Sequence, residues 1–230
     1  MSQFLFGVFP YIASVLAVVI TIYEYRRNSF HFSSISSQFL EGRKLFWGSI
    51  PWHYGVLTVL LGHLLAFLFP SAYIAFAKVP MRLLILEVIS LVCGFMAFLG
   101  LVMLFKRRML DSRINIITTN FDISLLLLLL IQVASGVGVA LFYRWGSSWY
   151  ASAVVPYLRS LWVLDPEISY IANMPFVVKL HVFNSFLIVA IIPFTRLMHF
   201  LVAPVHYFWR PYQIVIWNWS RRKIRKADQQ

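Results

Sequence analysis

Four of the six histidines in this chain, His53, His63, His181 and His199, lie within apolar stretches long enough to cross a membrane. An imidazole inside a membrane costs free energy unless it is ligated or hydrogen-bonded, so such a residue usually has a function. Two of these histidines share one stretch, and the other two share a second stretch. Two helices that each carry two histidines could hold two metal centres, one above the other across the membrane. This arrangement is suited to carrying electrons.

The composition of the chain is that of a membrane protein. Hydrophobic residues make up 60% of its 230 residues and charged residues 12%, whereas soluble domains contain about 25% charged residues. The mean hydropathy is +0.77. Cys93 is the single cysteine, so the chain can form no internal disulfide and has no c-type haem attachment motif. The net charge of +12 is concentrated at the ends of apolar runs, which favours orientation in a membrane over binding of nucleic acid.

The apolar stretches predict an all-α, polytopic membrane protein with five transmembrane helices in a bundle. A helix that crosses the hydrocarbon core needs about 20 residues. We expect one membrane domain over residues 1–215 and a basic cytoplasmic tail over residues 216–230. The predicted spans are residues 4–23, 52–70, 82–108, 122–143 and 176–202.

The basic residues predict the orientation of these spans. Most lysines and arginines lie between the first and second spans, between the third and fourth, and after the fifth. Because positive residues favour the cytoplasmic side, we expect the N-terminus outside and the C-terminus in the cytoplasm, in the cell (inner) membrane. Surface lipid is then a further expected partner of the basic tail.

The orientation also predicts how the histidines pair. The second and fifth spans run in opposite directions, which places His53 beside His199 near the cytoplasm and His63 beside His181 in the outer half. About five helical turns separate His181 from His199, so a continuous helix would present both on one face. The helical rise between His53 and His63 is about 15 Å, whereas the rise between His181 and His199 on the fifth span is about 27 Å. We expect a bend at Pro193 to absorb part of this mismatch.

The four histidines leave three interpretations, of which we favour haem. A single histidine in a span is often only a structural hydrogen-bonding residue, and structural zinc sites usually gather four ligands in one cluster. Low-spin haem needs two axial ligands and a broad apolar slot, which Gly55 and Gly62 would widen beside the backbone. We therefore predict two b haems, with His53 and His199 as ligands of the inner iron and His63 and His181 of the outer iron. His31 and His206 are expected at the surface.

The order and spacing of several short motifs resemble the gamma subunit of membrane-bound respiratory nitrate reductase, a dihaem cytochrome b. The match extends over nearly the whole chain up to about Val215. The motifs include Phe9-Pro10-Tyr11-Ile12-Ala13, Ser36-Ser37-Gln38-Phe39-Leu40, His53-Tyr54-Gly55, Gly62-His63, Lys106-Arg107-Arg108, Ile131-Gln132, Lys179-Leu180-His181, Pro193-Phe194-Thr195-Arg196-Leu197-Met198-His199 and Tyr212-Gln213.

This resemblance implies a quinol site on the outer side, beside the His63–His181 haem. It also implies cytoplasmic partners, namely an iron–sulfur subunit and a molybdenum-containing catalytic subunit that reduces nitrate. Gly62, Arg82 and Glu87 are the candidates for the quinol site. Arg82 stands where the family pattern has a lysine, and arginine has a different hydrogen-bond geometry.

Charged residues in the spans have further possible roles. Glu87 is a candidate proton acceptor during quinol oxidation, or alternatively a partner of Arg82 or Lys179. Arg196 and Arg113 are candidates for binding haem propionates, because arginine binds carboxylates with two parallel hydrogen bonds. Other arginines, such as Arg107 and Arg108, are read as orientation signals, and Asp122 is expected to cap the helix that it opens.

Two other functions remain open at the level of sequence. A related dihaem subunit could serve a sulfite-reduction or heterodisulfide complex, or pass electrons toward quinone. A transporter without haem could use the histidines as a proton relay, although the spans contain few polar residues that could line a pore.

Overall fold

The computed structural model describes residues 2–27, 43–143 and 145–202, and most of these residues are helical, with no strand among them. Five helices in this part of the chain are long and apolar enough to cross a membrane. The predicted all-α fold is therefore confirmed, and the number of these candidate spans equals the predicted five. The predicted tail over residues 216–230, together with His31 and His206, lies outside the described residues.

The five long helices differ from the predicted spans mainly at their ends. A π-helical turn, Phe4–Val8, leads into the first helix. The helices are α1 (Phe9–Arg27), α2 (Arg43–Leu68), α4 (Pro80–Leu110), α6 (Asn120–Phe142) and α10 (Phe176–Ile191).

The second span begins earlier than the sequence indicated, because Pro51 lies inside α2 instead of preceding it. A proline removes one backbone hydrogen bond, and a membrane helix tolerates this loss when its surroundings satisfy the freed carbonyl.

The fifth span is not one helix up to Val202. The α-helix α10 ends at Ile191, a 3₁₀ turn covers Ile192–Phe194, and Thr195 is extended with φ −126° and ψ 165°. A second 3₁₀ stretch, Arg196–Val202, then follows. The expected bend at Pro193 is confirmed and is a complete break, since the missing backbone hydrogen bond of proline is here followed by the extended Thr195.

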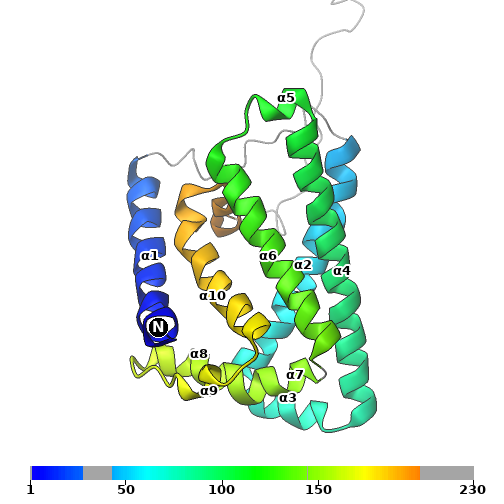
Figure 1. The fold of residues 1–230 in the computed structure, drawn as a ribbon, viewed down its shortest axis with the longest axis vertical. Coiled ribbons are helices and arrows are strands. Elements are labelled where there is room, and N and C mark those ends of the chain that lie inside the picture. Colours follow the sequence, from blue (N-terminus) through cyan, green and yellow to red (C-terminus); the bar gives the residue numbers. More distant parts are fainter. Residues whose placement is uncertain (1, 28–42, 144, 203–230) are drawn as a thin grey trace, which may run out of the picture.

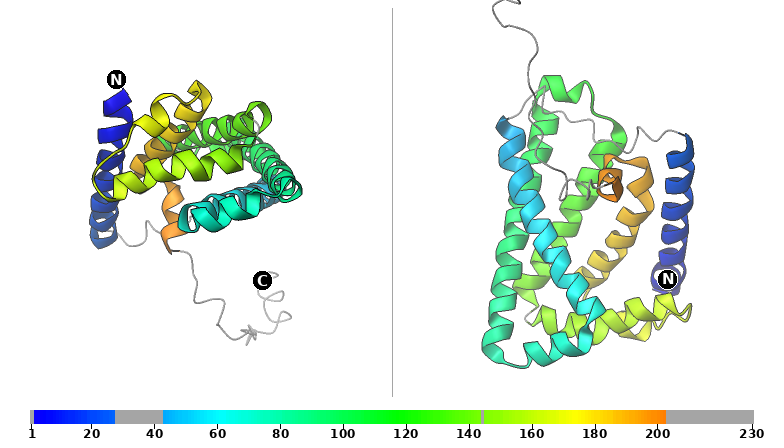
Figure 2. Two further views of the ribbon diagram at one scale, coloured as in Figure 1. Left: turned by 90° about the horizontal axis from the view of Figure 1, so that it is seen from below. Right: turned by 180° about the vertical axis from the view of Figure 1, so that it is seen from behind.

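The helices pack in a sequence of neighbours, in which α2 contacts α4, α4 contacts α6, α6 contacts α10, and α10 contacts α1 (Figure 1). Seen from below, α2 therefore faces α10 across the structure, and α1 forms one edge (Figure 2). This arrangement places the two histidine-bearing spans opposite each other.

Glycines allow α2 and α4 to approach closely. A Cβ atom on Gly55 would lie 2.6 Å from the Ala97 backbone nitrogen, and one on Gly100 would lie 2.7 Å from the Gly48 carbonyl oxygen. Neither distance is compatible with a side chain, so small residues are required at this helix interface. The expectation that Gly55 makes room for a flat ring is wrong, since Gly55 faces α4.

Short helices form a layer across the end of the structure at which the chain begins (Figure 1). They are α3 (Pro70–Ala77), α7 (Gly146–Trp149), a π-helical turn (Tyr150–Val154), α8 (Val155–Trp162) and α9 (Ser169–Ala172). At the opposite end, α5 (Ser112–Asn115) joins α4 to α6.

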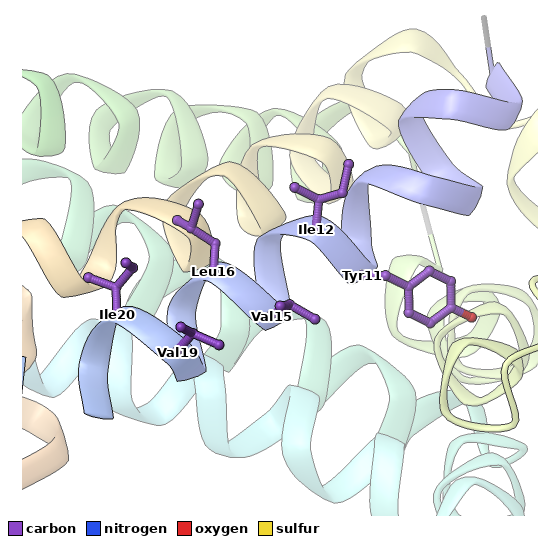
Figure 3. A pocket seen from close by; sticks show the side chains of 6 residues that line it. All are labelled: Tyr11, Ile12, Val15, Leu16, Val19 and Ile20. Carbon is purple, nitrogen blue, oxygen red and sulfur yellow. The ribbon is translucent and has the colours of Figure 1, made fainter. Parts of the chain in front are cut away.

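Tyrosines attach this layer to the first helix. The fully buried Tyr157 donates a hydrogen bond to the Phe6 carbonyl oxygen (2.8 Å), and Tyr11 donates one to the Leu161 carbonyl oxygen (3.0 Å). Beyond Tyr11, the same side of α1 lines an apolar groove of about 450 Å³ (Figure 3). The groove is lined by Tyr11, Ile12, Val15, Leu16, Val19 and Ile20.

Candidate metal centres

The four intramembrane histidines form two pairs in the structure. The ring centroids of His53 and His199 are 6.4 Å apart, and those of His63 and His181 are 6.5 Å apart. His53 and His63 come from α2, His181 comes from α10, and His199 comes from the 3₁₀ stretch after the break. The idea that His181 and His199 share one helical face is wrong, because the α-helix ends before His199.

All four imidazoles share one hydrogen bond, which is made by Nδ1. In each ring Nδ1 lies within hydrogen-bond distance of a backbone carbonyl oxygen, which can only accept, so Nδ1 carries the hydrogen. Nε2 then keeps its lone pair, as a metal ligand requires. The bonds join His53 to Ser49 (2.7 Å), His63 to Val59 (2.8 Å), His181 to Gln132 (3.0 Å) and His199 to Arg196 (2.8 Å).

The spacing of each pair fits one metal ion between two imidazoles. A metal–imidazole bond of about 2.0 Å on each side of one ion places the two ring centroids about 6.3 Å apart. The observed distances, 6.4 and 6.5 Å, are close to this value. Within the described ranges no group of three or more His, Cys, Asp or Glu side chains could hold a metal. The donor set of two imidazoles per centre therefore fits haem, whose macrocycle supplies the remaining ligands.

Polar side chains on α6 hold the His181 ring. The Ser135 hydroxyl lies 3.0 Å from His181 Nδ1, and the Gln132 side-chain amide nitrogen lies 3.2 Å from Nε2. Asn184, which is 3% exposed, donates from its amide to Gln132 Oε1 at 2.8 Å. Ser135 and Gln132 on α6 and Asn184 on α10 were given no role from the sequence, although polar residues in apolar spans near a histidine were an available signal.

Gly136 brings α6 close to the same ring. A Cβ atom at this position would lie 2.9 Å from His181 Cε1, so a side chain here would displace the imidazole. At Gly138, two residues further along α6, a Cβ atom would lie 3.8 Å from Val177 Cγ1, which is an ordinary contact. Only Gly136 is required by the position of His181.

Tyr150 covers the other histidine of this pair. Its ring meets the His63 ring edge-on at a centroid distance of 4.8 Å, and its hydroxyl donates to the His63 carbonyl oxygen at 3.4 Å. Burial, and to a smaller extent the nearby Tyr73, raise the pKa of Tyr150 to about 12. The phenol is therefore protonated at neutral pH and acts as a donor.

The three quinol-site candidates have different surroundings. A Cβ atom on Gly62 would meet no atom of the described residues within 4 Å, and the exposed Arg82 guanidinium lies 5.2 Å from the centroid of the Phe76 ring. Glu87 accepts a hydrogen bond from the Ser147 backbone nitrogen at 2.9 Å. The expected alternative partners of Glu87, Arg82 and Lys179, are wrong, because α7 lies against α4 and supplies this donor.

A cluster of charged side chains surrounds Asp122, at the end of the structure where α5 joins α4 to α6. The carboxylate contacts Arg108 Nη1 at 3.1 Å and Arg196 Nε at 3.2 Å. It also accepts from the Thr119 backbone nitrogen, so the expected helix cap is confirmed as a capping box. Treating Arg108 only as an orientation signal missed this ion pair. Arg113 is exposed on α5.

The family model of the nitrate reductase gamma subunit matches residues 2–218, nearly the whole chain. The chain belongs to this family. It is 33% identical to the nitrate reductase gamma chain of Bacillus subtilis, with 93% of this chain and 97% of the relative covered. The respiratory nitrate reductase 2 gamma chain of Escherichia coli is 30% identical, with 94% of this chain and 96% of the relative covered. The respiratory nitrate reductase 1 gamma chain of Escherichia coli is 28% identical, with 94% of this chain and 97% of the relative covered.

The family assignment and the five apolar helices agree with each other. Together they make the chain a multi-pass membrane subunit of the nitrate reductase type, and the resemblance found in the sequence is confirmed. Among the described residues, the two histidine pairs have a spacing that fits one metal ion each.

Proposed function

We propose that this gamma subunit is a dihaem cytochrome b that oxidises quinol on the outer side of the cell membrane. It would deliver the electrons to an iron–sulfur subunit in the cytoplasm and, beyond it, to a molybdenum-containing subunit that reduces nitrate. The observation that carries the proposal is the two imidazole pairs, each spaced for one metal ion. The names of the relatives favour nitrate over the sulfite-reduction and heterodisulfide complexes.

In this proposal His53 and His199 hold the inner haem, and His63 and His181 hold the outer haem. Haem, when bound, supplies one-electron redox chemistry. The carbonyl groups that accept from Nδ1 fix the orientation of each ring and make Nε2 a stronger ligand. In a membrane, the apolar helices would exclude water from this region and so lower the local dielectric constant.

The outer end of the structure would bind the quinol. Glu87, with its carboxylate held by the Ser147 backbone, is the candidate acceptor for a proton released by the quinol. Burial raises the pKa of Tyr73, and the charge of Glu87 raises it further. The hydrogen bond of Tyr73 to the Ser147 side chain acts in the opposite direction. Tyr73 therefore remains a neutral hydrogen-bond donor beside this carboxylate. Gly62 and Arg82 complete the candidate quinol site.

The N-terminus would face outside and the C-terminus the cytoplasm. In Figure 1, the end of α1, the beginning of α2 and the end of α4 lie at the same end of the structure. Arg26 and Arg27 end α1, and Arg107 and Arg108 end α4. This concentration of positive charge favours the cytoplasmic side. Arg196 and Arg113 remain the candidates for haem propionates at this end.

The proposal is tested by replacing one histidine of each pair in the complete complex. His63→Ala should remove only the outer haem, and His53→Ala should remove only the inner one, as measured by haem content and redox titration of the haem absorbance. Both variants should lose quinol-driven nitrate reduction and keep nitrate reduction by a soluble dye that reduces the other subunits directly.

His31→Ala is the matched control, because its histidine lies outside the apolar stretches, and it should retain both haems. Retention of two haems in either His63→Ala or His53→Ala would contradict the assignment of the ligands.

A further inference from the structure

His199 differs from the other three histidines in the backbone that carries it. His53, His63 and His181 lie within the regular helices α2 and α10. His199 lies in a 3₁₀ stretch that follows the extended residue Thr195. Long 3₁₀ stretches have poorer hydrogen-bond geometry than α-helices, so other contacts must fix the position of His199.

A continuous set of contacts runs from α6 to this imidazole. The Asp122 carboxylate binds Arg196 Nε at 3.2 Å, and Arg196 Nη2 donates to the Ile117 carbonyl oxygen at 3.3 Å. The backbone carbonyl of Arg196 in turn accepts from His199 Nδ1 at 2.8 Å. The side chain of Arg196 thus anchors the segment to the beginning of α6, and its backbone orients the ring.

Asp122 is itself held firmly. Its side chain is 7% exposed and lies in the first turn of α6. It accepts from the Thr119 backbone nitrogen at 3.1 Å and contacts Arg108 Nη1 at 3.1 Å. Charge-assisted hydrogen bonds in such a shielded place are strong and directional.

We propose that Asp122 is a positioning residue for the inner metal centre. Through Arg196, it fixes the segment that presents His199 to His53. The inference rests on the proposed function, because it takes the group between these two rings to be haem.

The outer centre provides an internal reference. His181 stands on α10 and is held by Ser135 and Gln132 from the middle of α6. None of these contacts involves Asp122. A change at Asp122 should therefore affect the inner centre and leave the outer centre as it is.

The test uses the complete complex with Asp122→Asn. We expect inner-haem content to fall about tenfold, or the remaining inner haem to show a shifted potential, while the outer haem keeps its content and potential. A tenfold difference in binding between the two redox states corresponds to about 59 mV for one electron. Asp122→Glu, which keeps the charge, should restore much of the inner haem.

Asp111→Asn is the matched control. Asp111 also caps a helix at this end, accepting from the Arg113 backbone nitrogen at 3.2 Å, and it forms an ion pair with Lys44 at 3.6 Å. Neither of these two contacts involves the segment Arg196–Val202, which carries His199. This variant should retain both haems with their normal potentials.

The outcomes separate the inference from the proposed function. If Asp122→Asn keeps both haems at unchanged potentials, or loses both equally, the positioning role is wrong. If Asp122→Asn fails to assemble, Arg196→Gln removes the same ion pair and should lose the inner haem selectively; an inner haem kept at its normal content and potential in that variant would refute the positioning role. A wild-type complex without haem would instead refute the proposed function.

Discussion

Gly136 offers the sharpest test of the outer centre, because a single added carbon would touch a ligand. In Gly136→Ala the new Cβ would lie 2.9 Å from His181 Cε1 and 3.5 Å from its Nδ1. Carbon atoms in contact prefer about 3.5–4.0 Å, so the ring or the helix must move by about 0.6 Å. The same movement would disturb the hydrogen bond between His181 Nδ1 and the Gln132 carbonyl.

The magnitude follows from the cost of overpacking. Inserting a methyl group into a packed site costs about 1–3 kcal/mol, and each 1.4 kcal/mol is a factor of about ten in affinity. We therefore expect the outer haem to bind about 5- to 150-fold more weakly in Gly136→Ala, with the inner haem unchanged. Haem content and redox titration of the purified complex measure the effect.

Gly138→Ala is the control for this experiment. It makes the same substitution on the same helix, where a Cβ would lie 3.8 Å from Val177 Cγ1, and it therefore accounts for the higher helix propensity of alanine. If Gly136→Ala and Gly138→Ala behave alike, with the outer haem at its wild-type content and potential, the position of His181 has been misjudged.

Two further predictions concern the frame and the proton acceptor. Gly55→Val would place a side chain against Ala97 and push α2 away from α4, which should destabilise the packing of these helices by about 1–3 kcal/mol or more. Both haems should therefore be lost together. Haem content would show this, and loss of one haem alone would contradict it. Glu87→Gln should slow quinol oxidation by about a hundredfold and change its pH profile. Glu167→Gln, a carboxylate in the outer layer bound to Ser169, is its control, and equal rates in both variants would exclude Glu87 as proton acceptor.

The sequence was sufficient for the number of spans and for the partners of the histidines. Both depend on properties that are local or additive. The length of an apolar stretch predicts a span, and the distribution of basic residues predicts its direction. Once the second and fifth spans run in opposite directions, the pairing of His53 with His199 and of His63 with His181 follows from depth alone.

The sequence was insufficient where contacts between distant segments decide. From the sequence, Gly55 could allow either a haem ring or a neighbouring helix to approach the backbone of α2. Only its contact with α4 in the structure shows that the helix takes this place. Pro51 and Pro193 are both prolines in apolar runs, yet one lies within a continuous helix and the other ends one. The ion pairs of Asp122 join residues about 14 and 74 positions away, which no helical period connects.

The most direct test of the central claim is a reduced-minus-oxidised optical spectrum of the purified wild-type complex, combined with quantification of its haem as the pyridine adduct. The two imidazole pairs predict b-type spectra and two haems for each copy of this chain. A colourless complex, or one haem per chain, would contradict the account.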